Sequence, residues 1–311
     1  MAGGADCQFG FVSETTPGTA LTVTKFLPIV SEKIQRNPNY IDTKTLSARR
    51  VLRITRPGAA EIGGPVRLEL ANTTLATLLR HMFGTIATTG AGPFTHTASP
   101  GDLTGKAMTM QVGRPDSTGV VRAFTYAGCK IKNWKIAAQI GEIANLDLDI
   151  VGMTETTATA LATAAYDATW SPFTFVEGSV TVAGSPVTTV RSVELSSDNK
   201  IQKTRVRMGS ANSKEPLENG VRAILGTIAT DFDALTNYNL CVNATQTALV
   251  LTFSNGTQSL TITMNVLFVG ETPTVDSADL LDQPLPYRVI SGTSDAAGIT
   301  AVLINSESSS A

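Results

Sequence analysis

Few side chains in this sequence could perform catalysis or hold a metal. The 311 residues contain two histidines, His81 and His96. His81 lies among leucine, methionine and phenylalanine, which is typical of a structural or capping histidine. His96 lies in a Gly- and Thr-rich stretch with no acidic residue or cysteine at the spacing of a metal site. We therefore predict no catalytic residues, no metal site, no cofactor-binding residues and no cofactor.

Two further patterns could suggest chemistry. Cys7, Cys129 and Cys241 are odd in number and widely separated, which indicates reduced core residues and not a disulfide framework or zinc site. The segment PGDLTGKA (100–107) has the composition of a phosphate-binding loop. Its Gly101 and Gly105 are one residue too close, and the segment precedes a strand pattern instead of a helix. We therefore exclude a phosphate loop.

Composition points to a structural role and leaves two classes open. Charged residues make up 16% of the chain, against the ~25% usual for soluble domains, and Thr, Ser, Ala and Gly replace them. Such a surface suits either a subunit covered by neighbouring copies or a secreted β-protein. The net charge of −2 gives no bulk attraction for nucleic acid.

Targeting signals are the next feature. The first residues lack a basic region followed by an apolar one, so we expect no secretory signal. The longest apolar stretch, 260–269, alternates with Thr and Asn and is too short to span a membrane. We expect a soluble protein made in the cytoplasm, with no membrane partner. The glycosylation sequons at Asn72, Asn243 and Asn255 are then chance matches.

Periodicity predicts a β-rich chain with one clear helix. Apolar residues recur at helical spacing over 75–83, with Thr74 as a candidate N-cap and Gly84 as the stop. Residues 85–105 are expected to form a loop, and 232–240 a short second helix. Strands are predicted at 49–56, 66–71, 106–112, 120–126, 130–140, 143–151, 180–183, 187–195, 201–208, 221–230, 247–254, 259–269, 287–290 and 299–304.

The length favours about two domains at ~150 residues each. The two halves echo each other, because Gly64 and Gly220 each open a similar passage from strand to helix. We predict the following division: an N-terminal arm (1–45), a first β-rich module (46–152) with the helix 75–83, a Thr/Ala-rich linker (153–177) and a second β-rich module (178–311).

Charges alternate on two of the predicted strands. Asp147 and Asp149 share one face, while Lys203, Arg205 and Arg207 share another. These could be solvated faces or one cross-strand ionic patch. Alternatively, the acidic face could line a passage through an assembly, and the basic face could contact a neighbouring subunit.

The order of motifs resembles the phage tail tube proteins. It runs through ETTPGTA, FLPIVSE, GPVRLEL, HMFG, HTASPGDLTGKAMTMQVGRP, FTYAGCKIKNWKI, VRSVELSSDNKI, GTIATDFD, LTITMNVLFVGETP and DQPLPYRVIS, and covers roughly residues 10–305. The resemblance implies a mainly β fold of β-sandwich or partial-barrel modules, each with a short flanking α-helix. Two duplicated modules would be present, so a ring would hold six chains, or three in a pseudo-hexameric arrangement.

The same resemblance implies a non-enzymatic virion protein of a siphovirus-type, non-contractile tail. It would self-assemble in the host bacterial cytoplasm into stacked rings that pass the genome. Its partners would be itself, the tape measure protein, and the tail terminator and distal tail proteins. Double-stranded DNA would pass without specific binding through a neutral-to-acidic bore, with Asp147 and Asp149 as contributors.

Axial contacts are expected from residues 1–45 and 85–105, so that deletion of 1–30 would leave a folded subunit unable to polymerise. The main alternative is a Thr/Ser-rich β-sandwich adhesin or carbohydrate-binding module. An adhesin would stay monomeric and bind glycans, whereas a tube protein would assemble and bind none. A monomeric enzyme is disfavoured, because no nucleophile–base pair or metal set is visible.

Overall fold

The computed structural model describes residues 3–46, 50–233, 235–270 and 281–308. The fold is mainly β, as predicted. The first strands are β1 (Gln8–Ser13), β2 (Lys25–Phe26), β3 (Ser31–Glu32), β4 (Gln35–Asn37), β5 (Tyr40–Asp42), β6 (Thr55–Pro57), β7 (Glu61–Glu69), β8 (Gly84–Thr89), β9 (Phe94–Pro100), β10 (Met108–Pro115), β11 (Val121–Gln139), β12 (Asn145–Gly152) and β13 (Thr154–Thr156). The later strands are β14 (Gly178–Val182), β15 (Ser185–Pro186), β16 (Val190–Asp198), β17 (Ala223–Asp231), β18 (Gln246–Ser254), β19 (Ser259–Phe268), β20 (Asp282–Val289) and β21 (Ile299–Asn305). The helices are α1 (Leu75–Phe83), α2 (Leu235–Val242) and α3 (Asp295–Gly298), and single 3-10 turns lie at Gly4–Asp6 and Phe175–Glu177.

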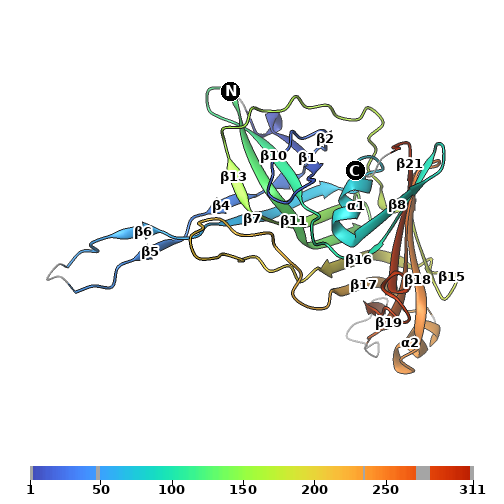
Figure 1. Cartoon of the computed structure of the whole chain (residues 1–311). Coiled ribbons are helices and arrows are strands. Elements are labelled where there is room, and N and C mark those ends of the chain that lie inside the picture. Colours follow the sequence, from blue (N-terminus) through green and yellow to red (C-terminus); the bar gives the residue numbers. More distant parts are fainter. Residues whose placement is uncertain (1–2, 47–49, 234, 271–280, 309–311) are drawn as a thin grey trace.

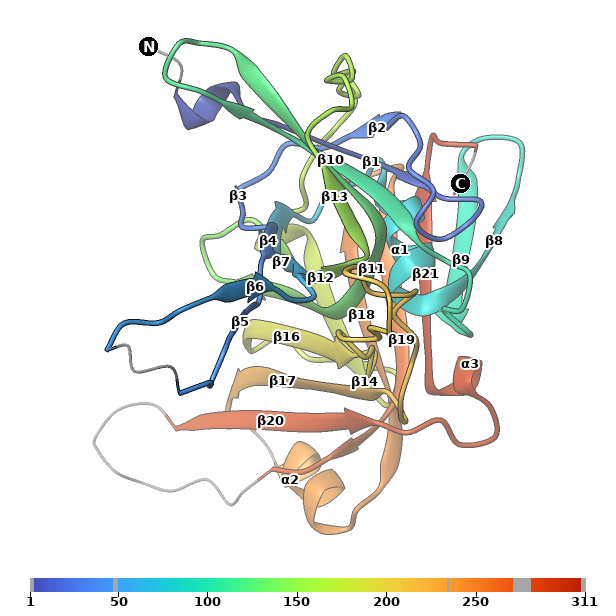
Figure 2. The ribbon, with the colours of Figure 1, turned by 60° about the vertical axis from the view of Figure 1, so that its left-hand side comes forward.

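One antiparallel run of strands forms a layer across the molecule (Figures 1 and 2). It leads from β7 through β12, the second half of β11, β16 and β17 to β20, and we call it the β7–β20 layer. At its far side β20 pairs with β19, which also pairs with β18 and β21. The strand run continues from β18 to β14 and from β21 to β9 and β8. The bent sheet therefore folds back over its own core as a β-sandwich.

A second sheet shares the long strand β11 with that layer. The first half of β11 pairs with β10 and β13, and β10 pairs with β1. Near its middle, β11 contains Gly128 at a φ of 68°, and the register shifts between Ile131 and Asn133. A bulge of this kind bends a strand and increases its twist, which lets one strand serve two sheets.

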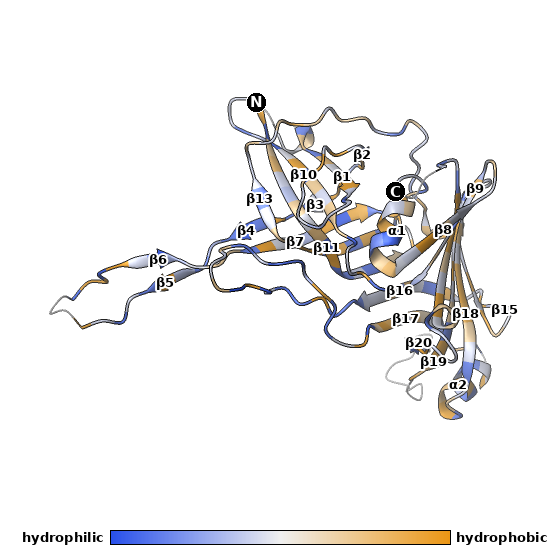
Figure 3. Ribbon diagram, viewed as in Figure 1, coloured by the Kyte–Doolittle hydropathy of each residue, from blue (hydrophilic) through white to orange (hydrophobic). Residues whose placement is uncertain are grey.

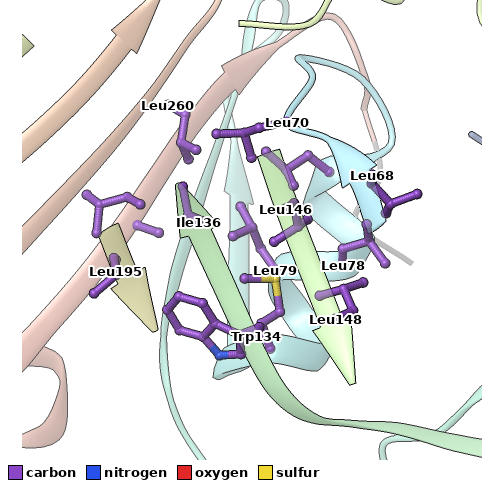
Figure 4. Close-up of a cluster of buried hydrophobic side chains, with 14 of the residues drawn as sticks. Leu68, Leu70, Leu78, Leu79, Trp134, Ile136, Leu146, Leu148, Leu195 and Leu260 are labelled. Atoms are coloured by element: carbon purple, nitrogen blue, oxygen red, sulfur yellow. The ribbon is translucent and has the colours of Figure 1, made fainter. Parts of the chain in front are cut away.

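The core lies between the β7–β20 layer and the folded-back strands, with α1 at one side (Figure 4). Leu78 and Leu79 of α1 belong to the same buried cluster as Trp134 of β11, and the Trp134 ring lies 5.3 Å from that of Phe83. Fully burying a leucine or phenylalanine side chain is worth about 1.5–3 kcal/mol, so these contacts fix α1 to the layer.

The helix α1 occupies the predicted range, but its N-terminus is capped differently. Thr74 has a φ of 63° and its side chain makes no capping hydrogen bond. The Thr74 backbone N–H donates instead to Oε2 of Glu307, at 2.7 Å. The cap is thus supplied from the C-terminal segment, a long-range contact that local sequence cannot reveal.

Two predicted elements are wrong. Residues 85–105 are not simply a loop, because β8 and β9 form a hairpin there. The inward residues of β9 are His96 and Ala98, which give no apolar alternation to detect. Residues 201–208 form no strand beyond an isolated bridge between Ile201 and Glu218. The charged side chains of that segment alternate in an irregular, largely exposed stretch and do not share one face of a sheet.

The segment predicted as an N-terminal arm contributes to the fold. Phe9 and Phe11 of β1 are completely buried, and β1 lies between β2 and β10. Deletion of residues 1–30 would remove these buried side chains, so we now expect it to destabilise the subunit as well as to affect polymerisation. The predicted division into arm, two modules and linker stays a prediction, although β11 and β16 pair directly across it.

The part of the chain that projects from the body is a hairpin (Figure 1). Its strands β5 and β6 pair with each other and with no other described strand. Residue 49 of the predicted strand 49–56 lies outside the described residues, and β6 is limited to Thr55–Pro57.

Candidate functional site

An organised polar surface covers the outward side of the β7–β20 layer. Along each strand, residues alternate between the core and this side. One row of directly paired residues crosses the layer from Arg67 to Asp147, Lys135, Ser196, Leu225 and Arg288. Paired residues in antiparallel strands share a face, so this row is continuous. We call this surface the polar face.

Charges on the polar face are paired across strands. Lys135 Nζ lies 2.6 Å from Glu194 Oε2, and Arg67 Nε lies 3.5 Å from Asp147 Oδ1. These side chains are 39–48% exposed, so each pair is worth at most about 1 kcal/mol. The described acids of the face are Glu61, Glu69, Asp147, Asp149, Glu194, Asp198, Asp231 and Asp282, and its described bases are Arg67, Lys132, Lys135, Arg191, Lys200 and Arg288. The face is therefore strongly polar and mildly acidic.

The two predicted charge groups end up in different settings. Asp147 and Asp149 lie together on the polar face, on β12. Lys203, Arg205 and Arg207 lie on the irregular loop 199–222, away from any sheet face. The structure therefore does not form the predicted basic strand face.

Loop 199–222 is fastened to the segment 101–106 by buried charge. The Lys130 side chain is 2% exposed, and its Nζ donates to Glu215 Oε1 at 2.6 Å and to the Leu103 carbonyl at 2.7 Å. Gly105 N–H also donates to Glu215, at 2.6 Å, and Leu103 N–H donates to Glu218. The glycine-rich segment excluded above as a phosphate loop thus binds carboxylates of this chain.

The histidines are structural. His81 is buried with Nε2 2.9 Å from Ser13 Oγ, and burial lowers its pKa to about 3, so the ring is neutral near pH 7. The Nδ1 atom of the buried His96 lies 2.8 Å from Thr88 Oγ1, and its Nε2 atom lies 3.0 Å from Asn305 Oδ1. It joins β9 to the C-terminal segment.

Cysteines and acidic groups form no metal cluster within the described residues. Cys129 is fully buried, and this burial raises the pKa of its thiol well above the usual range. Cys7 and Cys241 are half-buried free thiols. Within the same described ranges, no helix is long and apolar enough to cross a membrane.

Sequence reasoning missed the exposed apolar surface of the hairpin. Residues 40–54 include Tyr40, Ile41, Leu46, Val51, Leu52 and Ile54, which are 40–103% exposed. Hydrophobic positions along the hairpin alternate with hydrophilic ones in Figure 3. Single exposed apolar residues are ordinary, but a group on a projecting element indicates a contact surface. The sequence TLSARRVLRITR (45–56) could have revealed this surface, because its apolar residues are interspersed with arginines. The described apolar residues of this segment stay outside the core.

Comparison with protein families gives one match: residues 4–289 fit the family described as Phage tail tube protein. No curated protein matches the chain.

Proposed function

The chain belongs to the phage tail tube protein family, and from that premise we propose that it assembles into stacked rings whose bore passes the genome. The family is one of structural virion proteins, so the chain is a component of the virion tail. Membership also implies self-association into a tube. Rings, genome passage and the choice between six chains and three per ring belong to the proposal.

The polar face is the observation that carries the proposal, and we assign it to the bore. A bore lined with unpaired bases would bind phosphates through counterion release and slow the DNA. On the polar face most bases lie against an acid, as Lys135 lies against Glu194 and Arg67 against Asp147. A lining of this kind stays wet and offers DNA neither strong attraction nor strong repulsion.

Ring closure would join the polar faces of neighbouring copies. At one edge of the layer, the described strands that cover β7 are the short strands β3 and β4. At the other, the pairing of β20 with β19 among the described residues covers Val266–Phe268. Partly open edges of a sheet promote aggregation unless a neighbouring strand covers them. Strands pooled from several copies would form a barrel wide enough for an aqueous channel.

Assembly in the host cytoplasm and contacts with the tape measure, tail terminator and distal tail proteins remain part of the proposal. They are supported by family membership alone.

Negative-stain electron microscopy over a concentration series, with light scattering for mass, tests the proposal. We expect rings or hollow tubes, with the symmetry visible end-on. A protein that stays monomeric at every concentration and binds glycans would instead be the adhesin that the composition also allows.

A further inference from the structure

The projecting hairpin is strongly basic as well as apolar. The sequence between 33 and 56 contains the cations Lys33, Arg36, Lys44, Arg49, Arg50, Arg53 and Arg56, and Asp42 is its only acidic residue. Within the described residues no ion pair joins these cations to an acid of the same chain. The hairpin with its flanks, residues 33–58, is called the basic arm below. For a chain of net charge −2, this is a marked concentration of positive charge at one end.

An apolar groove lies at the opposite end of the β7–β20 layer. It has a volume of about 390 Å³, and Val176, Val187, Val190, Val193, Ala138 and Phe253 are among its lining residues. The arm enters the layer where Ile62 pairs with Gly152, whereas the groove lies beyond the end where Gln139 pairs with Ser192. In Figure 1 the hairpin projects to the left and β15, beside the groove, lies at the right.

The rim of this groove is acidic. Glu142 is exposed, and its carbonyl accepts the Phe175 N–H at the groove wall. Glu177 lies beside the lining residue Val176, which is 89% exposed. Asp231 and Asp282 lie nearby and share a single cation, Arg191. The groove end therefore carries a surplus of negative charge, opposite in sign to the arm.

We propose that the groove is the seat for the basic arm of a second copy of this chain, stacked head to tail. The proposal rests on the proposed tube assembly and names the surfaces that join successive rings. Apolar side chains such as Leu52 and Ile54 enter the groove, and Arg53 and Arg56 meet the acidic rim. Because the two surfaces lie at opposite ends of one subunit, the contact repeats without closing and builds a stack. Charge complementarity sets its polarity.

Site-specific crosslinking tests the contact in the full-length chain. Leu52→Cys protein is mixed with Val176→Cys protein under assembly conditions and oxidised mildly. We expect disulfide-linked dimers from the mixture, and no more than the wild-type background from either variant alone. The matched control mixes Leu52→Cys with Val120→Cys, because Val120 is another exposed valine, on the β10–β11 turn. Crosslinking through Val120 and not through Val176 overturns the proposal.

Charge reversal provides a second, independent test. Arg53→Glu/Arg56→Glu and Glu142→Lys/Glu177→Lys proteins, each checked for folding by circular dichroism, should form rings that do not stack, with at least a tenfold rise in the concentration needed for tubes. The combined four-site variant should recover tube formation to within about threefold of wild type.

Failure of the seat and failure of the tube give different results. Normal tubes from both reversed variants, without crosslinking through Val176, overturn the seat and leave the tube intact. Failure of the wild-type protein to form rings or tubes removes the proposed function, and the seat with it.

Discussion

Lys135 on β11 and Glu194 on β16 form an ion pair, 2.6 Å between Nζ and Oε2, on the outward face of a layer whose other side is the core. Both side chains are 40% exposed or more, so the pair adds little to folding. Its consequence is electrostatic, because the Glu194 carboxylate neutralises the positive charge of Lys135, which would otherwise be free to bind phosphate.

Reversing acids on the polar face should make the tube retain DNA. Glu194→Lys/Asp147→Lys protein should fold, with a loss of about 1 kcal/mol or less, and should assemble. Its tubes should co-sediment with short double-stranded DNA at low salt and release it as salt rises. The control is Glu155→Lys on β13, outside the face. Equal DNA binding by the two variants would remove the polar face from the bore.

The cap on α1 should be sensitive to the C-terminal segment. Glu307→Gln removes the charge that accepts the Thr74 N–H, so we expect a loss of about 1 kcal/mol in the free energy of unfolding. Urea titration of the subunit under conditions that prevent assembly measures it. Glu61→Gln, at an exposed carboxylate, should change stability by less than about 0.5 kcal/mol. An unchanged midpoint for Glu307→Gln would show that another group caps the helix.

Loop 199–222 should depend on the Lys130–Glu215 pair. Glu215→Gln leaves a buried ammonium without its carboxylate, and breaking such pairs costs about 3–5 kcal/mol. Since Glu215 is 23% exposed, we expect about 3 kcal/mol, together with faster proteolysis within the loop. The double variant Lys130→Met/Glu215→Gln should recover part of the loss. If the double variant is as unstable as the sum of the two single ones, the pair is not coupled.

His81 should make the subunit less stable in acid. Its pKa is lowered by burial from 6.5 to about 3, so the unfolded chain binds a proton in that interval and the folded chain does not. Stability therefore rises with pH between about 3 and 6.5, by up to ~1.4 kcal/mol per pH unit from this residue. Urea midpoints at pH 7 and pH 5 should differ less in His81→Gln than in wild type. Equal differences would mean that His81 titrates normally.

Much of the fold could be predicted where the apolar pattern was regular. The helix Leu75–Phe83 and the strand containing Asp147 and Asp149 are examples, because one face of each is buried by leucines. The β8–β9 hairpin escaped prediction because its buried residues are small or polar. The cap from Glu307 escaped because it spans 233 residues.

The candidate site was only half visible in the sequence. Alternation placed Asp147 and Asp149 on one face, but their balance with Arg67 and Lys132 depends on strand order. The same alternation misled at Lys203, Arg205 and Arg207, which pair with no strand of the described part of the chain. The basic arm could not be recognised from the sequence, because apolar residues such as Leu52 and Ile54 occur equally in a buried core.

Cryo-electron microscopy of the assembled wild-type tube would show directly which face of the subunit lines the bore. We expect a hollow tube whose bore is lined by the outward side chains of the β7–β20 layer, with Lys135, Glu194 and Asp147 facing the channel. A tube whose bore is lined instead by Lys203, Arg205 and Arg207, or a protein that forms no tube, would contradict this expectation.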